Sequence, residues 1–351
     1  MTTRHTSEWY NLSSNKEADK HGSHASISMN GLHSSPDHTA TPVLAKMVQI
    51  ACSFFQNLHT LEPFSVAHAT AQASLLDEVS ATYLCLLAPS DIYSGPFTKD
   101  ELLALLSSMP NTAPGPDGIP YSFWKALHCC VLAYNKQHPS SLLTPFWDSF
   151  LDLANGVKSN GSSCCGFKNT NISLFFKKGG PTLTMNYCPI SSMNTDCKMY
   201  TNLINNCLSP WAVLKLHDDQ KGFVPGCLIT NHTRLASEVA HLAEATNTNG
   251  FIISLDQAKA YDCVNQYWLL KVLASMGIDP DLRLMIGDLI HKCCSRICIN
   301  GRIAPFSHCT EVSIKVTPSL ACSSTSASSL LQCVSMMSCE ASQYTAYPLS
   351  R

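Results

Sequence analysis

The sequence predicts an α+β fold, in which amphipathic helices alternate with short strands. A capping box of Thr98 and Glu101 opens a helix. The apolar run FIISL at 251–255 has the length of a buried strand, and the pair Asn300-Gly301 is the strongest two-residue signal for a β-hairpin. With 351 residues and 45% hydrophobic content, the chain can build a sizeable core.

Composition limits the classes of function. The formal net charge is −2, so no global basic field favours nucleic acid or an anionic membrane, and such binding must be local. The polar start MTTRHTSEWY lacks a secretory signal, and no apolar run reaches the roughly 18 residues of a membrane span. We therefore expect a soluble intracellular chain with no membrane contact, whose 18 cysteines are reduced.

The first part of the chain changes from polar to helical. Residues 1–42 are rich in Ser, Asn, His and Thr without apolar periodicity, which predicts a disordered linker. Helical spacing begins at 43–59. In the capped helix, Phe97 and Leu102 are placed as a hydrophobic staple. The prolines and glycines of 110–120 then predict a rigid, exposed loop.

The middle of the chain predicts helices around one strand. The strand is NISLFFKKGG at 171–180, which ends in two lysines and a glycine turn. A polar, glycine-containing loop lies at 217–226. Helices are predicted at 121–134, 144–155, 199–214 and 233–247.

A second unit begins at residue 251. Asn265 can cap a helix that ends at Gly277, and 295–306 reads as a hairpin. After Cys309 the chain becomes serine-rich, and nothing there is expected to complete a sheet. The apolar face predicted for the helix consists of Trp268, Leu269, Val272, Leu273 and Met276.

Several of these segments, in this order, resemble the reverse transcriptase of non-LTR (long-interspersed-element type) retrotransposons. The resemblance covers about residues 45–310 and implies an incomplete right-hand polymerase with fingers and a partial palm. It would copy an RNA template from a DNA primer with Mg²⁺ as cofactor. The stretches that carry it are APGPDGIPYSFWK (113–125), FFKKGGPTLTMNYCPISSMNTDCKMYTNLINNCL (175–208), HDDQKGFVPG (217–226), FIISLDQAKAYDCVN (251–265) and LLKVLASMGI through RICING.

The resemblance assigns roles to four residues. Asp256, at the end of the FIISL strand, corresponds to the first metal-binding catalytic aspartate. Tyr261 corresponds to the aromatic gate that favours deoxynucleotides, and Lys177 and Lys178 could meet template or triphosphate phosphates. By themselves, these residues are equally compatible with a capping acid, ordinary packing of the tyrosine and a solvated lysine pair.

Three cysteines replace arginines of the family pattern: Cys188, Cys227 and Cys263. A thiol has neither the charge nor the fork of donors with which arginine binds phosphates, so affinity for template and primer should be weakened. A single cytosine-to-thymine change converts an arginine codon beginning with CG into a cysteine codon. The pattern therefore suggests mutational decay.

The C-terminal region indicates a displaced reading frame. Codons allowed for IKVTPSLACSSTSASSLL, read with the frame displaced by two nucleotides, can encode Gln-Gly-Asp-Pro-Leu-Ser-Ser-Leu-Leu-Phe-Asn-Ile-Cys-Ile-Glu-Pro-Leu. This resembles the next motif of the family, so we infer a frameshift near 311–314. The Asp-Asp hairpin that would complete the metal site is then not encoded in frame, and the pair Asp218-Asp219 is no substitute.

The sequence thus predicts a reverse transcriptase-like fragment, truncated after the first palm motif and inactive as a polymerase. The alternative is a non-catalytic nucleic-acid or partner-binding protein derived from it. A zinc protein built on His291, Cys293, Cys294 and Cys298 is disfavoured by the ligand spacing. The expected regions are a linker (1–42), a helical pre-fingers region (43–95), a fingers-like region (96–250), a partial palm (251–310) and an out-of-frame tail (311–351).

Overall fold

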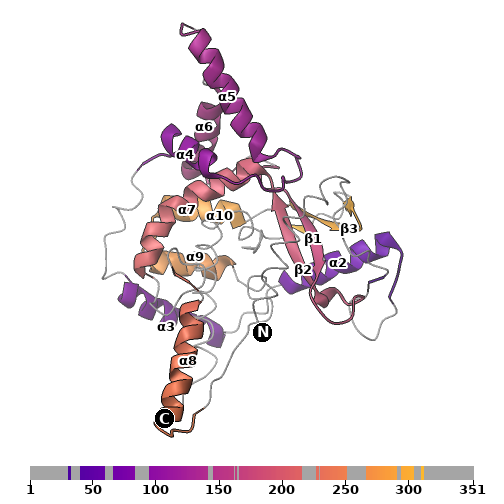
Figure 1. Cartoon of the computed structure of the whole chain (residues 1–351), viewed down its shortest axis with the longest axis vertical. Helices are drawn as coiled ribbons and strands as arrows, with labels where there is room; N and C mark the ends of the chain where they lie inside the picture. The colour runs from indigo at the N-terminus through magenta and orange to yellow at the C-terminus, as the bar shows by residue number, and fades with distance from the viewer. Residues whose placement is uncertain are drawn as a thin grey trace. The chain divides into compact units, whose positions relative to one another are not determined.

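The computed structural model is α+β, with helices and one small sheet (Figure 1). None of the described helices is long and apolar enough to cross a membrane. The predicted strand 251–255, the loop 217–226 and the tail after Glu311 lie outside the described residues. The structure describes residues 31–32, 40–59, 66–83, 95–140, 145–161, 163, 166–215, 227–228, 230–250, 266–290, 294–303 and 310–311.

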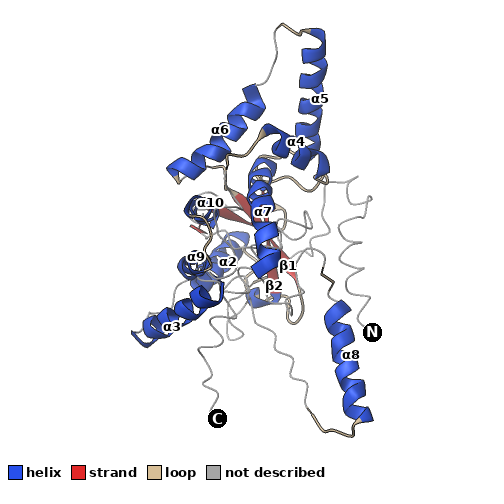
Figure 2. Cartoon of the chain, turned by 90° about the vertical axis from the view of Figure 1, so that its left-hand side faces the viewer, coloured by secondary structure: helices blue, strands red, loops and turns tan. Residues whose placement is uncertain are grey.

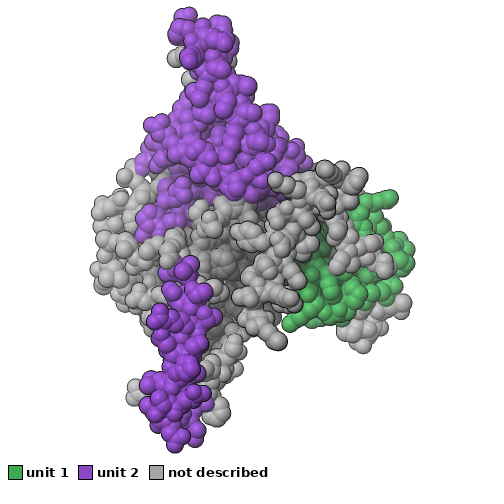
Figure 3. Space-filling model, in the orientation of Figure 1, with its two compact units in different colours: residues 1–55, 172–190, 296–309 green, residues 56–171, 191–295, 310–351 purple. Residues whose placement is uncertain are grey.

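The chain divides into two compact units (Figure 3). Unit 1 comprises 1–55, 172–190 and 296–309, and unit 2 comprises 56–171, 191–295 and 310–351. Unit 1 contains most of helix α2 (Leu44–His59), where the sequence predicted a helix at 43–59.

The sheet has the strand order β2-β1-β3-β4, and β5 pairs antiparallel with β3. Thr310 and Glu311 of β5 lie opposite Ser295 and Cys294. This two-residue strand follows Cys309 directly, whereas the serine-rich stretch from Thr317, in which nothing is expected to complete a sheet, lies outside the described residues. The strands are β1 (Thr170–Phe176), β2 (Tyr187–Met193), β3 (Cys294–Ile299), β4 (Arg302–Ile303) and β5 (Thr310–Glu311).

The hairpin of β3 and β4 confirms the turn prediction. Asn300 and Gly301 have φ values of 50° and 73°, the left-handed pair that a type I′ turn requires. Ile299 pairs with Arg302, so Asn300 and Gly301 form the whole loop of the hairpin.

Unit 2 contains the remaining α-helices; Figure 2 draws all the described helices in blue. Helix α10 packs on α6, α7 and α9, while α4 packs on α5, α6 and α7. The helices are α3 (Val66–Tyr83), α4 (Lys99–Ser108), α5 (Tyr121–Gln137), α6 (Pro145–Asn160), α7 (Thr195–Lys215), α8 (Thr230–Ala245), α9 (Gln266–Ser275) and α10 (Pro280–Ile290).

Helix α4 begins as predicted. The Thr98 hydroxyl accepts from the Glu101 backbone N–H at 3.3 Å, and the Glu101 carboxylate accepts from the Thr98 backbone N–H at 2.8 Å. Phe97 and Leu102, the two staple positions, are both buried in the same hydrophobic cluster. The capping box therefore fixes where this helix enters the core.

The predicted apolar face of α9 is confirmed, because all five of its residues are buried. Gly277 ends the helix with φ 82°. Its N–H donates to Ala274 O and that of Ile278 to Leu273 O, both at 3.0 Å, which is a Schellman motif. Helix α10 follows and was not predicted, although Asp279 caps it and Pro280 occupies its first position.

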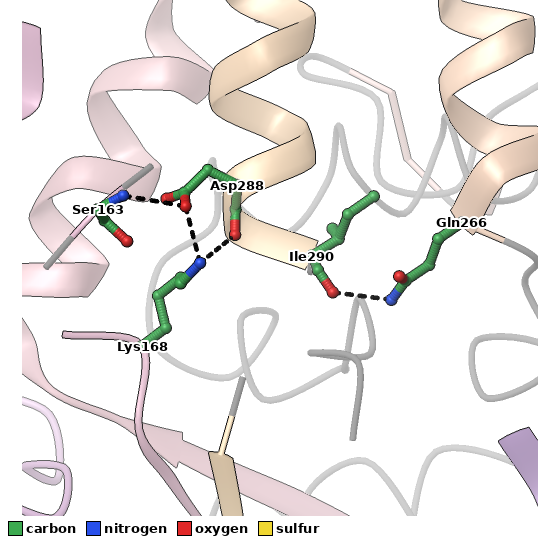
Figure 4. Close-up of polar contacts among 5 residues, drawn as sticks. All are labelled: Ser163, Lys168, Gln266, Asp288 and Ile290. Carbon is green, nitrogen blue, oxygen red and sulfur yellow. Dashed lines mark hydrogen bonds and ion pairs between the residues drawn. The ribbon is translucent and has the colours of Figure 1, made fainter. Parts of the chain in front are cut away.

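Side chains from distant segments cap the C-terminal end of α10 (Figure 4). Lys168 Nζ donates to Asp288 O at 2.5 Å and to Asp288 Oδ1 at 2.8 Å, and Gln266 Nε2 donates to Ile290 O at 2.8 Å. The Ser163 N–H also donates to Asp288 Oδ1, at 3.0 Å. The Lys168–Asp288 ion pair is buried, so it ties the segment that precedes β1 to α10.

Candidate functional site

Two stretches that carry the family resemblance meet in unit 2. Residues 113–120, between α4 and α5, lie against residues 194–198 at the start of α7, and we call this contact the loop–helix junction. Lys198 Nζ donates to Ala113 O at 2.9 Å, and the Asp117 N–H donates to Asn194 Oδ1 at 3.2 Å. Thr195 Oγ1 donates to Ile119 O at 2.8 Å. Side chains at the start of one helix thus bind the backbone of a loop about 80 residues earlier.

Trp124 extends the junction into α5. Its indole Nε1 donates to Thr195 Oγ1 at 2.7 Å, in a buried position. The Trp124 ring also stacks on Phe146 of α6, with ring centroids 5.0 Å apart. The hydroxyl of Thr195 therefore joins the loop, α5 and α7 through one atom.

Gly115 makes the closest approach at the junction. A Cβ atom at this position would lie 2.3 Å from Asn194 N and 2.4 Å from Asn194 Oδ1. Only glycine fits there without displacing the backbone of Met193 and Asn194, directly before α7. The sequence predicted a rigid, exposed loop, but residues 114–116 are half-buried, because this contact covers one side of the turn.

Lys198 and Asp196 at the junction are desolvated, while Asp117 is exposed. Lys198 is only 6% exposed; burial lowers its pKa, while the Cys197 thiol and Asp117 act in the opposite direction. Burial raises the pKa of Asp196, and the nearby Asp117 carboxylate raises it further, against a hydrogen bond from the Cys197 N–H. The pKa of Tyr121 is also raised, first by burial and then by Cys197 and Asp196. These contacts position the loop on the start of α7.

Lys177 and Lys178 lie directly after β1, in unit 1, and both side chains are exposed. Their backbone is held by a tight turn, in which the Lys177 N–H donates to Asn186 O at 2.9 Å and Asn186 Nδ2 donates to Gly180 O at 2.8 Å. Gly179 has φ 90° and lies close to the Asn186 side chain. The turn presents two ammonium groups to solvent from a fixed backbone.

The other predicted site residues are described only in part. Asp256, Tyr261 and Cys263 lie outside the described residues. Cys188 is half-buried on β2, and Cys227 is half-buried before α8. Of the four residues to which the resemblance assigns roles, the structure thus describes the lysine pair.

No group of three or more His, Cys, Asp or Glu residues in the described part of the chain could hold a metal ion. The predicted Mg²⁺ ligand, Asp256, is not among these residues. For the zinc alternative, Cys294 and Cys298 share one face of β3. Four residues along a strand separate them by about 13 Å, too far for one zinc ion with bonds of about 2.3 Å.

Sequence reasoning missed the junction residues Asn194, Thr195 and Lys198. The proline and glycine pattern at 113–120 predicted a turn, but it does not identify the segment on which a turn packs. A polar Asn-Thr pair directly before a helical pattern is a capping signal and could have indicated the start of α7.

Comparison with known proteins gives two findings. Residues 176–325 match the family described as "Reverse transcriptase (RNA-dependent DNA polymerase)". A Xenopus laevis protein, "Transposon TX1 uncharacterized 149 kDa protein", is 28% identical over 235 residues, which are 66% of this chain and 16% of that protein. The chain therefore spans a small part of the length of this relative. Lys177, Lys178 and Cys188 fall within the family match, and the loop at 113–120 precedes it.

Proposed function

We propose that this chain, which carries a reverse transcriptase domain of the non-LTR retrotransposon type, is an RNA-directed DNA polymerase fragment that does not polymerise DNA in its present reading frame. The family match over 176–325 carries the first half of the proposal. The loop–helix junction supports it, because residues 113–120 precede the match and yet pack against residues 194–198 inside it.

An RNA template and a DNA primer are the proposed partners. Lys177 and Lys178 are the described residues best suited to bind their phosphates, since both ammonium groups are exposed on a fixed turn. Cys188 lies on the adjoining strand β2, where the family pattern has arginine. We expect weak binding, because a thiol makes no charge-assisted bond to phosphate.

Asp256 is the residue proposed to hold Mg²⁺, and Tyr261 is proposed to select deoxynucleotides. Bound divalent ions would stabilise the attacking and leaving oxygens of nucleotidyl transfer. A single carboxylate leaves such ions undercoordinated, so Asp256 needs acidic partners. The displaced frame near 311–314 removes the motif expected next. The family match runs to residue 325 and spans this position, so nucleotide sequence is the direct test.

The first experiment is to sequence genomic DNA and transcript across codons 310–316 and beyond. A displaced frame in both supports the proposal, and an undisplaced frame contradicts the predicted inactivity. The second experiment is primer extension on an RNA template with Mg²⁺, using the chain in its present reading frame and a frame-restored chain. We expect extension from the restored chain only, and none from its Asp256→Asn variant. Extension by the chain in its present frame, abolished by Asp256→Asn, would overturn the inactivity.

The alternative function is nucleic-acid binding without catalysis. The junction favours it, because its contacts hold the loop at 113–120 on the start of α7 and could support a binding surface that has no catalytic role. Salt-dependent binding to an RNA–DNA duplex without extension would support this function. Absence of binding at low salt would exclude it.

A further inference from the structure

Unit 1 carries a local excess of positive charge. Its described residues, at 31–32, 40–55, 172–190 and 296–303, include five lysines or arginines and no aspartate or glutamate. The whole chain has a formal net charge of −2, so this excess is not a property of the chain as a whole. A local basic field favours a polyanionic partner. The five cationic residues are Lys46, Lys177, Lys178, Arg296 and Arg302.

Phe175 lies on β1, two residues before Lys177, and its side chain is 44% exposed. The neighbouring ring of Phe176 contacts the buried Tyr187, with ring centroids 5.6 Å apart. Because side chains alternate along a strand, Phe175 and Lys177 project from the opposite face of β1. The Lys177 N–H donates to Asn186 O at 2.9 Å, so the strand pairing extends as far as Lys177.

Cys188 is the residue opposite Phe175 on β2. Lys177 pairs with Asn186 and Phe176 contacts Tyr187, so the two strands run in opposite directions at this end of the sheet. One step further along each strand brings Phe175 opposite Cys188. The small, half-buried cysteine leaves the phenyl ring exposed.

A single exposed phenylalanine is ordinary on a protein surface, and its exposure alone identifies no ligand. Here the exposed ring precedes two exposed ammonium groups on a fixed backbone turn. An aromatic ring beside cationic side chains is the combination that binds a nucleic-acid base and its flanking phosphates. The absence of acidic residues from the described part of unit 1 favours the same ligand.

We propose that unit 1 binds single-stranded nucleic acid, with Phe175 stacking on a base and Lys177 and Lys178 binding the adjacent phosphates. This inference rests on the proposed nucleic-acid partner and adds the form of that partner and the residue that recognises it. In a single strand a base can lie flat on the phenyl ring, whereas in a duplex each base is already stacked between its neighbours. Phosphates are accessible to the lysines in both forms.

Fluorescence anisotropy of the full chain tests the stacking. The probes are an oligothymidylate of about 12 nucleotides, within the site sizes of single-strand binders, and a duplex of the same length. Phe175→Ala should weaken binding of the single strand at least fivefold and leave duplex binding unchanged, and Phe175→Tyr should retain the affinity. The matched control is Phe123→Ala on α5 in unit 2, which removes another exposed ring (48%) and should change neither affinity. Circular dichroism shows whether each variant keeps its secondary structure.

An abasic strand of the same length separates stacking from charge. It keeps the phosphates and lacks the bases, so Phe175→Ala should leave its affinity unchanged. Lys177→Gln should weaken binding of both strands and lower the slope of log K against log salt by about 0.7.

Three results overturn the stacking role while leaving the proposed function in place. They are unchanged binding of oligothymidylate by Phe175→Ala, an equal loss on the duplex, and an equal loss on the abasic strand. Absence of all binding at low salt overturns the stacking role together with the nucleic-acid partner.

Discussion

Gly115 and Asn194 are in direct backbone contact across 79 positions of sequence, because a Cβ on Gly115 would lie 2.3 Å from Asn194 N. The loop at 113–120 therefore depends on the absence of one side chain. Three side chains, those of Asn194, Thr195 and Lys198, then bind its backbone. This contact links the start of α5 to the start of α7.

Gly115→Ala should destabilise the protein by about 2 to 3 kcal/mol, because the new methyl group overlaps backbone that cannot move freely. Chemical denaturation measures the change in the free energy of unfolding. Gly250→Ala is the control, since a Cβ there meets nothing within 4 Å. Equal effects of the two substitutions would mean that the close contact is not what requires glycine.

Lys168→Met should destabilise the protein by about 3 to 5 kcal/mol, because it leaves the buried Asp288 carboxylate without a counter-charge. Replacing both residues, as Lys168→Met with Asp288→Leu, should cost less than the single change. A double-mutant cycle in urea measures the coupling. The control is Lys99→Met, which breaks a more exposed pair with Asp148 and should cost about 1 kcal/mol or less. A similar loss at both sites would contradict the role of burial.

Asp196→Asn should stabilise the protein at neutral pH. Burial, followed by the Asp117 charge, raises the pKa of the folded-state Asp196 carboxyl above 3.8. At a pH between the unfolded-state pKa of 3.8 and the higher folded-state pKa, the folded state binds more protons than the unfolded state. The free energy of unfolding therefore falls as pH rises through this range. The difference between variant and wild type should therefore shrink as pH falls toward 3.8.

Urea denaturation across this pH range measures the difference. Asp100→Asn is the control, because Asp100 occupies the first turn of α4 and is exposed. It removes a charge near a helix N-terminus without the burial. A gap between Asp196→Asn and wild type that widens as the solution becomes more acidic would reject the argument.

Cys188→Arg should tighten binding to an RNA–DNA duplex at low salt and steepen the salt dependence of the affinity. One added phosphate contact changes the slope of log K against log salt by about 1. Fluorescence anisotropy at several salt concentrations measures both effects. Cys130→Arg, at an exposed position on α5, is the control for added charge. An equal gain from both would show that position 188 has no special role.

Several elements were predictable because their signals are local. The capping box at Thr98, the Asn300-Gly301 turn and the glycine stop at Gly277 involve residues within a few positions of one another, and all three are confirmed. The buried face of α9 was predictable because a helix repeats every 3.6 residues. The family resemblance was predictable from motifs in a fixed order, and the family match agrees with it.

The sequence by itself thus determined the fold class, several of the helices and the family resemblance, because each depends on short-range chemistry or on motif order. Only the tertiary structure placed the loop at 113–120 on the start of α7, paired Lys168 with Asp288 and left apolar side chains of α8 exposed. The physical reason is sequence distance. The partners lie 77 and 120 positions apart in the first two cases, and neither periodicity nor turn chemistry specifies a contact over such a separation.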